Sequence, residues 1–296
     1  MELKGIFTAL VTPFKDGALD EGALRRLIDF QIGSGVDGIV PCGTTGEAST
    51  LSYEEHERVI EITVEEASGR VPVIAGTGSN STEEAIELTE KAKKIGADFC
   101  LLTTPYYNRP TQEGLYRHFK KIAETVDIPL ILYNIPSRTG VNLLPETVAR
   151  LSEIPNIVGI KEASGSLTQV VEIERLARDG FEILSGDDAL FLPMMSVGAR
   201  GVISVASNVV PEKMKELFVL FFEQHDVKRA KELNSWLYPL FQALFIETNP
   251  IPVKETLYFM GMIERELRLP LCPLSESNRE RLKGVIKGYG LLKRGS

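Results

Sequence analysis

The segment Ile157-Val158-Gly159-Ile160-Lys161 is an apolar run that ends in one charged residue. Side chains of a strand point alternately to its two faces, so a run without polar alternation indicates a strand buried on both faces, as in parallel sheets. Seven other runs rich in Val, Ile and Leu share the pattern: Gly5–Val11, Gly38–Cys42, Val73–Gly76, Phe99–Thr103, Leu130–Tyr133, Glu182–Ser185 and Gly201–Ser204. Amphipathic segments separate these runs, and the alternation predicts an α/β fold, a (β/α)8 TIM barrel.

The segments between the strands carry helix signals. Leu24, Leu27 and Ile28 follow the 3.6-residue period of an amphipathic helix. Ser52 precedes Glu55 by three residues and Ser81 precedes Glu84 by three, which predicts that two helices begin with capping boxes. Glycines stand where several helices are expected to end: Gly35, Gly69, Gly96 and Gly180.

A doubly wound open sheet uses the same alternation and is the main competing fold. It usually carries a G-x-G-x-x-G turn after its first strand, whereas here that strand is followed by Val11-Thr12-Pro13-Phe14. Beyond Asp226 the strand pattern stops, and prolines at 250, 252, 270 and 273 interrupt helical segments. We therefore expect a barrel over residues 1–225 and, over 226–296, a C-terminal helical extension that packs on it.

Composition excludes several classes of protein. The 296 residues are 43% hydrophobic, as in an ordinary globular chain, and 33 basic against 41 acidic side chains give a net charge of −8, which argues against a nucleic-acid partner. No apolar run is long enough to cross a membrane and no signal peptide is recognisable, so a cytoplasmic protein is expected.

Cys42, Cys100 and Cys272 are too scattered for a disulfide framework or a zinc site, and the first two are expected to be buried hydrophobes. Cys42 as a catalytic thiol is the alternative.

Lys161 is the sharpest candidate for chemistry. In (β/α)8 enzymes the active site is built from the carboxyl ends of the strands, and Lys161 ends its strand. Burial disfavours an ammonium, lowers the lysine pKa and leaves a free amine that can form a Schiff base with a carbonyl substrate. The alternative is a lysine that extends its charged end to solvent.

Neighbouring strand ends add further candidates. Tyr133 ends the preceding strand, where its phenol could transfer protons or serve only as a buried hydrogen-bonding group. The turn Gly43–Gly46 offers two hydroxyls and backbone N–H groups that suit a small carboxylate, although turns use these residues for geometry alone as well. Arg138 could bind a second carboxylate with two hydrogen bonds, or merely cover the surface.

Four motifs follow one another on successive strand ends: Gly43-Thr44-Thr45-Gly46-Glu47, Tyr106-Tyr107-Asn108, Tyr133-Asn134-Ile135-Pro136 and Gly159-Ile160-Lys161-Glu162. In this combination the chain resembles the dihydrodipicolinate synthases of the class I pyruvate aldolase and lyase family. The resemblance runs from about Gly5 to the end and includes Val11–Phe14 and Thr248–Lys254.

The resemblance implies condensation of pyruvate with L-aspartate 4-semialdehyde to 4-hydroxy-tetrahydrodipicolinate, in lysine and diaminopimelate biosynthesis. Lys161 matches the lysine that forms the Schiff base with pyruvate, and Tyr133 matches the proton donor and acceptor. Thr44 and Tyr107 match the relay residues, and the residue matching Tyr107 comes from a neighbouring subunit, as part of a homotetramer built as a dimer of dimers. Protons then move without a metal, and no cofactor is expected.

The resemblance also implies binding residues. Thr45 and the backbone at Ile203 match pyruvate-binding positions, Gly186 lines the pocket, and Arg138 matches the residue that holds the carboxylate of the semialdehyde.

A second ligand site follows from the resemblance. Family members that are inhibited by lysine bind it at the dimer interface, and the corresponding positions are Ser49, His56, Asn80, Glu84 and Tyr106. Two features depart from the usual pattern: Tyr53 stands where a histidine is common, and Ala48-Ser49 reverses the usual Ser-Ala order. Lysine feedback is therefore a hypothesis to be tested by titration.

Two rival functions remain. N-acetylneuraminate lyases and 2-keto-3-deoxy sugar-acid aldolases share the lysine and the tyrosine, but a sugar acid needs a hydroxyl-binding surface where Arg138 offers a carboxylate site. A non-catalytic pyruvate- or amino-acid-sensing barrel would be expected to lack Lys161 or Tyr133, and both are present.

Overall fold

The protein is described here by a computed structural model that covers residues 3–293. The chain forms two compact units. The first unit combines Met1–Gly5 with Pro72–Ile203, and the second combines Ile6–Val71 with Ser204–Ser296. The predicted division at residue 225 is a division by sequence pattern and stays a prediction.

Six parallel strands form the sheet of the first unit. Each pairs with the next along the chain, in the order β5 (Ile74–Gly76), β6 (Phe99–Thr103), β7 (Leu130–Asn134), β8 (Ile157–Glu162), β9 (Glu182–Ser185) and β10 (Gly201–Ser204). Their apolar side chains are almost all buried, as expected for strands covered on both faces. The Gly5 amide donates to the Arg200 carbonyl at 3.0 Å, beside the start of β10.

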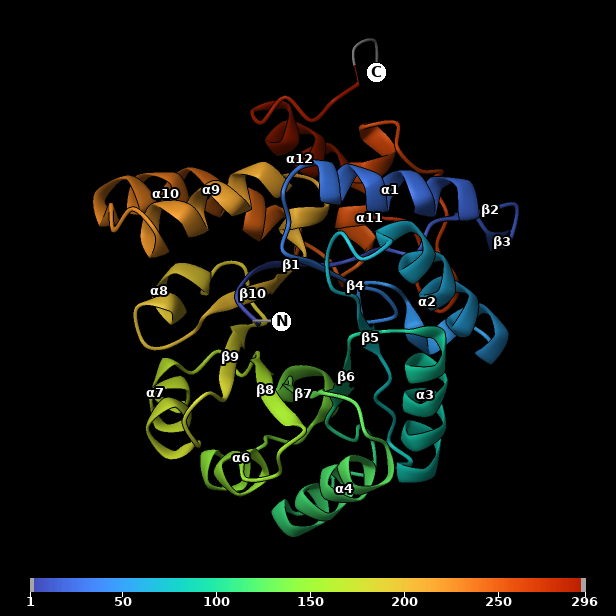
Figure 1. Cartoon of the computed structure of the whole chain (residues 1–296). Helices are drawn as coiled ribbons and strands as arrows, with labels where there is room; N and C mark the ends of the chain where they lie inside the picture. Colours follow the sequence, from blue (N-terminus) through green and yellow to red (C-terminus); the bar gives the residue numbers. More distant parts are fainter. Residues whose placement is uncertain (1–2, 294–296) are drawn as a thin grey trace. The chain divides into compact units, whose positions relative to one another are not determined.

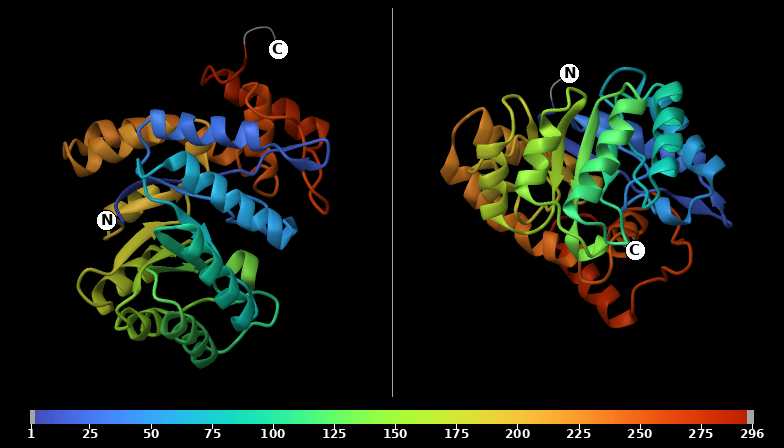
Figure 2. Two further views of the ribbon diagram at one scale, coloured as in Figure 1. Left: turned by 45° about the vertical axis from the view of Figure 1, so that its right-hand side comes forward. Right: turned by 90° about the horizontal axis from the view of Figure 1, so that it is seen from below.

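Helices connect these strands and cover their outer face. In Figure 1, α3, α4, α6 and α7 lie outside the strands of this unit, and Figure 2 shows them next to one another from a second direction. The helices of the first unit are α3 (Thr82–Ile95), α4 (Gln112–Thr125), α5 (Pro136–Thr139), α6 (Pro145–Ser152), α7 (Leu167–Leu176) and α8 (Phe191–Met195).

The second unit contains the first two barrel strands and most of the helices at the end of the chain. Strand β1 (Gly5–Ala9) pairs in parallel with β4 (Gly38–Val40), and β2 (Phe14–Lys15) pairs antiparallel with β3 (Ala18–Leu19). Helices α9 and α10 pack together, as do α1 and α2 (Figure 1). Its helices are α1 (Glu21–Gly33), η1 (Ala48–Thr50), α2 (Tyr53–Ala67), η2 (Ala206–Asn208), α9 (Pro211–Phe222), α10 (Val227–Ala243), α11 (Ile251–Phe259) and α12 (Glu276–Lys287).

The structure confirms the predicted fold. Every one of the eight predicted strands is present, all eight are parallel, and each is followed by at least one helix, which is the (β/α)8 arrangement. The helical character of the chain beyond Asp226 is also confirmed by α10, α11 and α12. The sequence pattern did not indicate the short hairpin of β2 and β3.

One predicted capping box is complete and the other is only half formed. Ser52 and Glu55 exchange both hydrogen bonds at the start of α2. At the start of α3 the Ser81 hydroxyl accepts the Glu84 amide, but the Ser81 amide donates to the Ser79 hydroxyl instead of to Glu84. The Ser79 hydroxyl donates to the Glu84 carboxylate, so a serine stands between the two partners that the capping box would join directly. The prediction of a second capping box is therefore wrong in this detail.

Among residues 3–293, no helix combines the length and the apolar character needed to span a membrane. Within the same range, no cluster of His, Cys, Asp and Glu side chains is arranged to hold a metal ion.

Candidate active site

Lys161 lies near the carboxyl end of β8, with only 7% of the residue exposed. Burial lowers the pKa of Lys161 from its ordinary 10.5 to about 7, because an ammonium loses its hydration there. The Asp188 carboxylate opposes this shift and the Arg138 guanidinium adds to it. A substantial fraction of the Lys161 side chains therefore carries a free amine at neutral pH, which is the nucleophilic form.

Tyr133 is the neighbour of Lys161 across the sheet. The register of β7 and β8 places Tyr133 directly opposite Lys161, and the lysine Nζ lies 4.2 Å from the centre of the tyrosine ring. Tyr133 is 4% exposed, so the ring covers the amine on one side and keeps water away from it. The two side chains that proton transfer to and from a Schiff base would require are thus in contact within the first unit.

Gly186 lines the space beside the lysine side chain. A Cβ atom at this position would lie 3.2 Å from Cε and Cγ of Lys161 and 2.7 Å from the Ala163 side chain. No larger residue fits without a shift, so the glycine leaves room for Lys161 to extend. Arg138 lies on α5, is exposed, and is close enough to Lys161 for its charge to act on the amine.

Asp188 and a polar network around Glu162, the residue after Lys161, were not among the predicted site residues. Asp188 is 2% exposed, and its charge favours the protonated amine of Lys161. The Glu162 carboxylate, next to Lys161, accepts hydrogen bonds from Asn134 Nδ2 at 3.0 Å, Gln169 Nε2 at 3.1 Å and the Ser164 amide at 2.6 Å. Asn134 follows Tyr133 directly, so the network ties the ends of β7 and β8 together. The sequence signal for this network was a polar residue directly after each candidate, Asn134 after Tyr133 and Glu162 after Lys161.

The Gly43–Glu47 turn belongs to the second unit. Thr45 is 3% exposed and Thr44 is half-buried. The Thr45 hydroxyl accepts a hydrogen bond from Asn249 Nδ2 at 3.0 Å. Within this unit the turn presents polar groups of the kind that bind small anions.

The remaining predicted binding residues differ in their exposure. The backbone of Ile203 lies in β10, and its side chain is 1% exposed. Tyr107 is 92% exposed and has a positive φ of 70°, so its ring projects from the loop after β6 rather than packing in its own unit.

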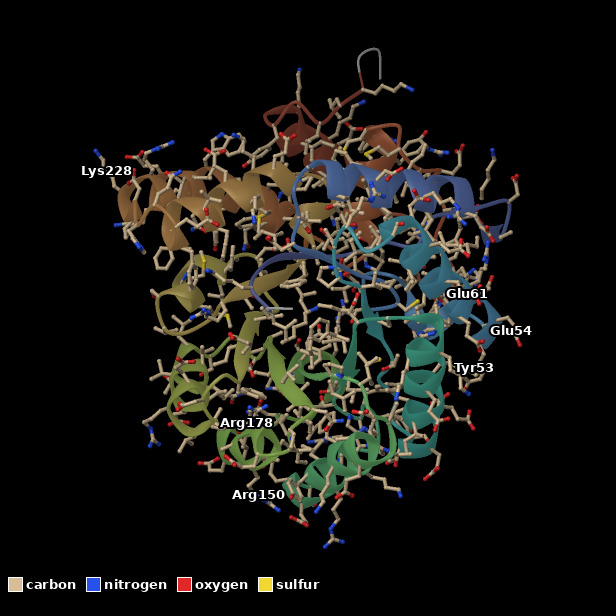
Figure 3. All side chains as sticks on the ribbon, viewed as in Figure 1. Tyr53, Glu54, Glu61, Arg150, Arg178 and Lys228 are labelled. Atoms are coloured by element: carbon tan, nitrogen blue, oxygen red, sulfur yellow. The ribbon has the colours of Figure 1, made fainter. Side chains whose placement is uncertain are left out.

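The residues predicted for lysine binding lie on both units. In the first unit, Asn80 Nδ2 donates to the Tyr106 carbonyl at 3.3 Å, and Glu84 is in the first turn of α3. In the second unit, Ser49 is exposed in η1 and His56 is 6% exposed in α2. Tyr53, the departure from the usual pattern, is 48% exposed at the first position of α2 (Figure 3).

The cysteines are placed as expected. Cys42 and Cys100 are buried, and burial raises the pKa of both thiols, to about 12 for Cys100. A buried thiol with a raised pKa is a poor nucleophile, which argues against the catalytic role that was the alternative for Cys42.

Together, the fold and the enclosed amine beside a tyrosine define a (β/α)8 barrel with the arrangement that an enzyme with an amine nucleophile requires. The profile of the Dihydrodipicolinate synthetase family matches residues 2–289. The 4-hydroxy-tetrahydrodipicolinate synthase of Syntrophus aciditrophicus is 61% identical over 289 residues, which cover 98% of this chain and 99% of the relative. The chain belongs to the dihydrodipicolinate synthetase family.

Solved structures of dihydrodipicolinate synthases are also similar to this chain. The crystal structure of dihydrodipicolinate synthase from Aquifex aeolicus superposes with a TM-score of 0.97 at 51% identity, over 99% of this chain and 100% of that one. A dihydrodipicolinate synthase from Cyanidioschyzon merolae, solved with lysine bound, superposes with a TM-score of 0.96 at 42% identity, over 99% of this chain and 100% of that one.

Proposed function

We propose that this chain condenses pyruvate with L-aspartate 4-semialdehyde to 4-hydroxy-tetrahydrodipicolinate, a cytoplasmic step of lysine and diaminopimelate biosynthesis. The observation that carries the proposal is the enclosed Lys161 amine, whose pKa is lowered to about 7, in contact with Tyr133. The names of the relatives, at 55–61% identity, support the synthase rather than a sugar-acid lyase.

The neutral Lys161 amine attacks the keto carbon of pyruvate to form a carbinolamine, which takes up one proton and loses its hydroxyl as water to give a protonated Schiff base. This iminium withdraws electrons, so a proton leaves the C3 methyl group and an enamine forms without a metal. The enamine carbon then attacks the aldehyde of the semialdehyde. The amino group of the semialdehyde finally displaces Lys161 from the iminium carbon, which closes the ring and frees the enzyme.

Each of these steps moves a proton, and we assign this proton transfer to Tyr133. Its ring lies against Lys161 Nζ, and burial keeps bulk water from competing for the proton. We assign the relay to solvent to Thr44 and Tyr107, because both match the relay residues of the family.

The binding roles follow the same assignment. Thr45 and the Ile203 backbone bind the carboxylate of pyruvate, and Gly186 leaves room beside Lys161. Arg138 binds the carboxylate of the semialdehyde. Its exposed position on α5, within electrostatic reach of Lys161, supports this role.

Borohydride reduction in the presence of pyruvate tests the proposal. We expect one pyruvate adduct, located on Lys161 by peptide mass mapping. Since the reacting amine must be neutral and its pKa is about 7, the initial rate of trapping should rise about tenfold per pH unit well below pH 7 and level off above it. An adduct on another lysine, or a rate that does not depend on pH between 5 and 9, would contradict the mechanism.

The substrate is tested by turnover. Pyruvate with L-aspartate 4-semialdehyde should be turned over, and pyruvate with N-acetylmannosamine or glyceraldehyde should not. Turnover with a sugar aldehyde alone would instead support the rival lyases.

We further propose that the chain acts as a homotetramer, a dimer of dimers. The exposed ring of Tyr107 supports this, because a relay residue needs enclosure that a partner subunit would provide. Sedimentation at assay concentration tests it, and a fully active monomer would refute the role of Tyr107.

Feedback inhibition by L-lysine is the last part of the proposal. The four residue types at His56, Asn80, Glu84 and Tyr106 support it, as does the lysine bound in the Cyanidioschyzon merolae relative. Titration of L-lysine against turnover tests it, and an unchanged rate at millimolar lysine would remove it.

A further inference from the structure

The second unit contains a buried lysine that the mechanism does not use. Lys254 lies on α11 and is 3% exposed. Its ammonium forms an ion pair with the Glu47 carboxylate and donates to the Thr12 carbonyl at 2.9 Å. Its Nζ also lies 4.4 Å from the centre of the buried Phe14 ring. A buried charge is retained only where its partners are well placed, so this lysine is held in one position.

Glu47, the partner of Lys254, is the last residue of the Gly43–Glu47 turn. Its side chain is 0% exposed, and its second carboxylate oxygen accepts the Arg268 amide at 3.1 Å. Its backbone has a left-handed φ of 54°, which is uncommon for a residue with a side chain. The contacts of both carboxylate oxygens therefore fix the end of the turn in this conformation.

Thr12 connects the same ammonium to the middle of the turn. Its carbonyl accepts from Lys254, and its hydroxyl donates to the Gly46 carbonyl at 2.7 Å. A Cβ atom on Gly46 would lie 3.1 Å from the Cys42 amide nitrogen and 3.2 Å from the Leu10 carbonyl oxygen. The turn is thus packed closely against the chain, and a shift of Thr12 or Glu47 would displace the intervening residues.

Asn249, five residues before Lys254, contacts the Gly43–Glu47 turn at the Thr45 hydroxyl. Its Nδ2 donates to Thr45 Oγ1 at 3.0 Å, and both side chains are buried. A hydroxyl that accepts one hydrogen bond keeps its own proton for another partner. A carboxylate only accepts hydrogen bonds, so Thr45 in this arrangement presents the donor that a carboxylate requires.

We infer that Asn249 and Lys254 are positioning residues that hold the Gly43–Glu47 turn, and with it the Thr45 hydroxyl, in the geometry that binds the pyruvate carboxylate. The inference rests on the proposed function, because it takes Thr45 as a pyruvate contact. It gives the residues at the end of the chain a part in substrate binding: they do not touch the substrate but determine where the turn of the second unit presents its donor.

Glu255 provides a matched control on the same helix. It follows Lys254, is also 3% exposed, and forms ion pairs with Arg265 and Arg279, each at 2.7 Å. Both arginines lie in the C-terminal segment and not in the Gly43–Glu47 turn. Loss of its charge therefore disturbs a buried ion pair of the same unit without releasing the turn.

The experiment compares Lys254→Met, Asn249→Ala and Glu255→Gln for kcat, KM for pyruvate and thermal unfolding. A displacement of about 1 Å in a site costs about 100-fold in rate, so kcat/KM for pyruvate should fall about 100-fold in Lys254→Met. Asn249→Ala removes one hydrogen bond, so its KM for pyruvate should rise about tenfold with kcat within about threefold of the parent. Glu255→Gln should lower the unfolding temperature but keep kcat and KM within about threefold.

Equal loss of kcat/KM in Lys254→Met and Glu255→Gln would show a general structural effect and overturn the inference. Unchanged KM in Asn249→Ala would overturn it too, and this variant serves if Lys254→Met does not fold. Borohydride trapping on the parent protein separates failure of the proposed function from failure of the positioning role. A parent that forms no pyruvate adduct refutes the proposed function, whereas a normal adduct with unaffected variants refutes only the positioning role.

Discussion

Replacing Lys161 with arginine is expected to abolish turnover, with kcat lowered by at least ~10³-fold, the scale on which loss of a covalent nucleophile acts. Arginine stays protonated at any pH at which the protein is folded, so it offers no free amine to a ketone. Lysine at this position does offer one, because burial lowers its pKa to about 7. The measurement is steady-state turnover of pyruvate with L-aspartate 4-semialdehyde, together with borohydride trapping.

Lys121→Arg is the control, since Lys121 is an exposed lysine on α4. It should keep kcat within about threefold of the parent, and the pyruvate adduct should remain in it. Circular dichroism should show that Lys161→Arg is folded. Turnover by a folded Lys161→Arg protein above a tenth of the parent rate would mean that the covalent step does not use this residue.

The fold could be predicted because the strands are marked locally. Runs such as Phe99–Thr103 and Glu182–Ser185 have the bounds of β6 and β9, since each is a short apolar run between helices. The hairpin of β2 and β3 escaped prediction because each strand has only two residues, too few for any period to show. The half-formed capping box of α3 escaped it because Ser79, outside the four-residue motif, takes the place of a direct bond.

Only those site residues could be predicted that lie at strand ends or match a family motif. Lys161 and Tyr133 end neighbouring runs, so their contact follows from the order of parallel strands. The charge of Asp188 near Lys161 depends on the path of the loop after β9, which no pattern indicates. The ion pair of Glu47 and Lys254 joins residues 207 positions apart. Such a contact depends on tertiary packing, and no local signal in the sequence shows it.

Lys161 should also cost the protein stability, and Lys161→Met is expected to stabilise it at neutral pH. A lysine whose pKa falls from 10.5 to about 7 on folding opposes folding by about 4 kcal/mol at pH 7. Methionine has a similar length and carries no charge, so it avoids this cost. The pKa of about 7 already includes the attraction to Asp188, so this whole cost disappears with the charge. We expect a stabilisation of about 4 kcal/mol at pH 7, or roughly 6 °C in unfolding temperature.

The pH dependence distinguishes this cause from better packing. Between pH 7 and 10.5 the unfolded chain binds the Lys161 proton and the folded protein does not, so the stability of the parent rises with pH in this window. Lys161→Met has no such proton uptake, and its advantage should be full below pH 7 and disappear towards pH 10.5. Unfolding in denaturant at pH 6, 7, 8.5 and 10, at one protein concentration, measures this pH dependence.

The control is Lys121→Met, whose free energy of unfolding should differ from that of the parent by less than about 0.5 kcal/mol at every pH. A Lys161→Met protein with no advantage at pH 7, or with an advantage that does not change with pH, would show that folding does not depress the pKa of this amine, and the account of its reactivity would then lose its physical basis.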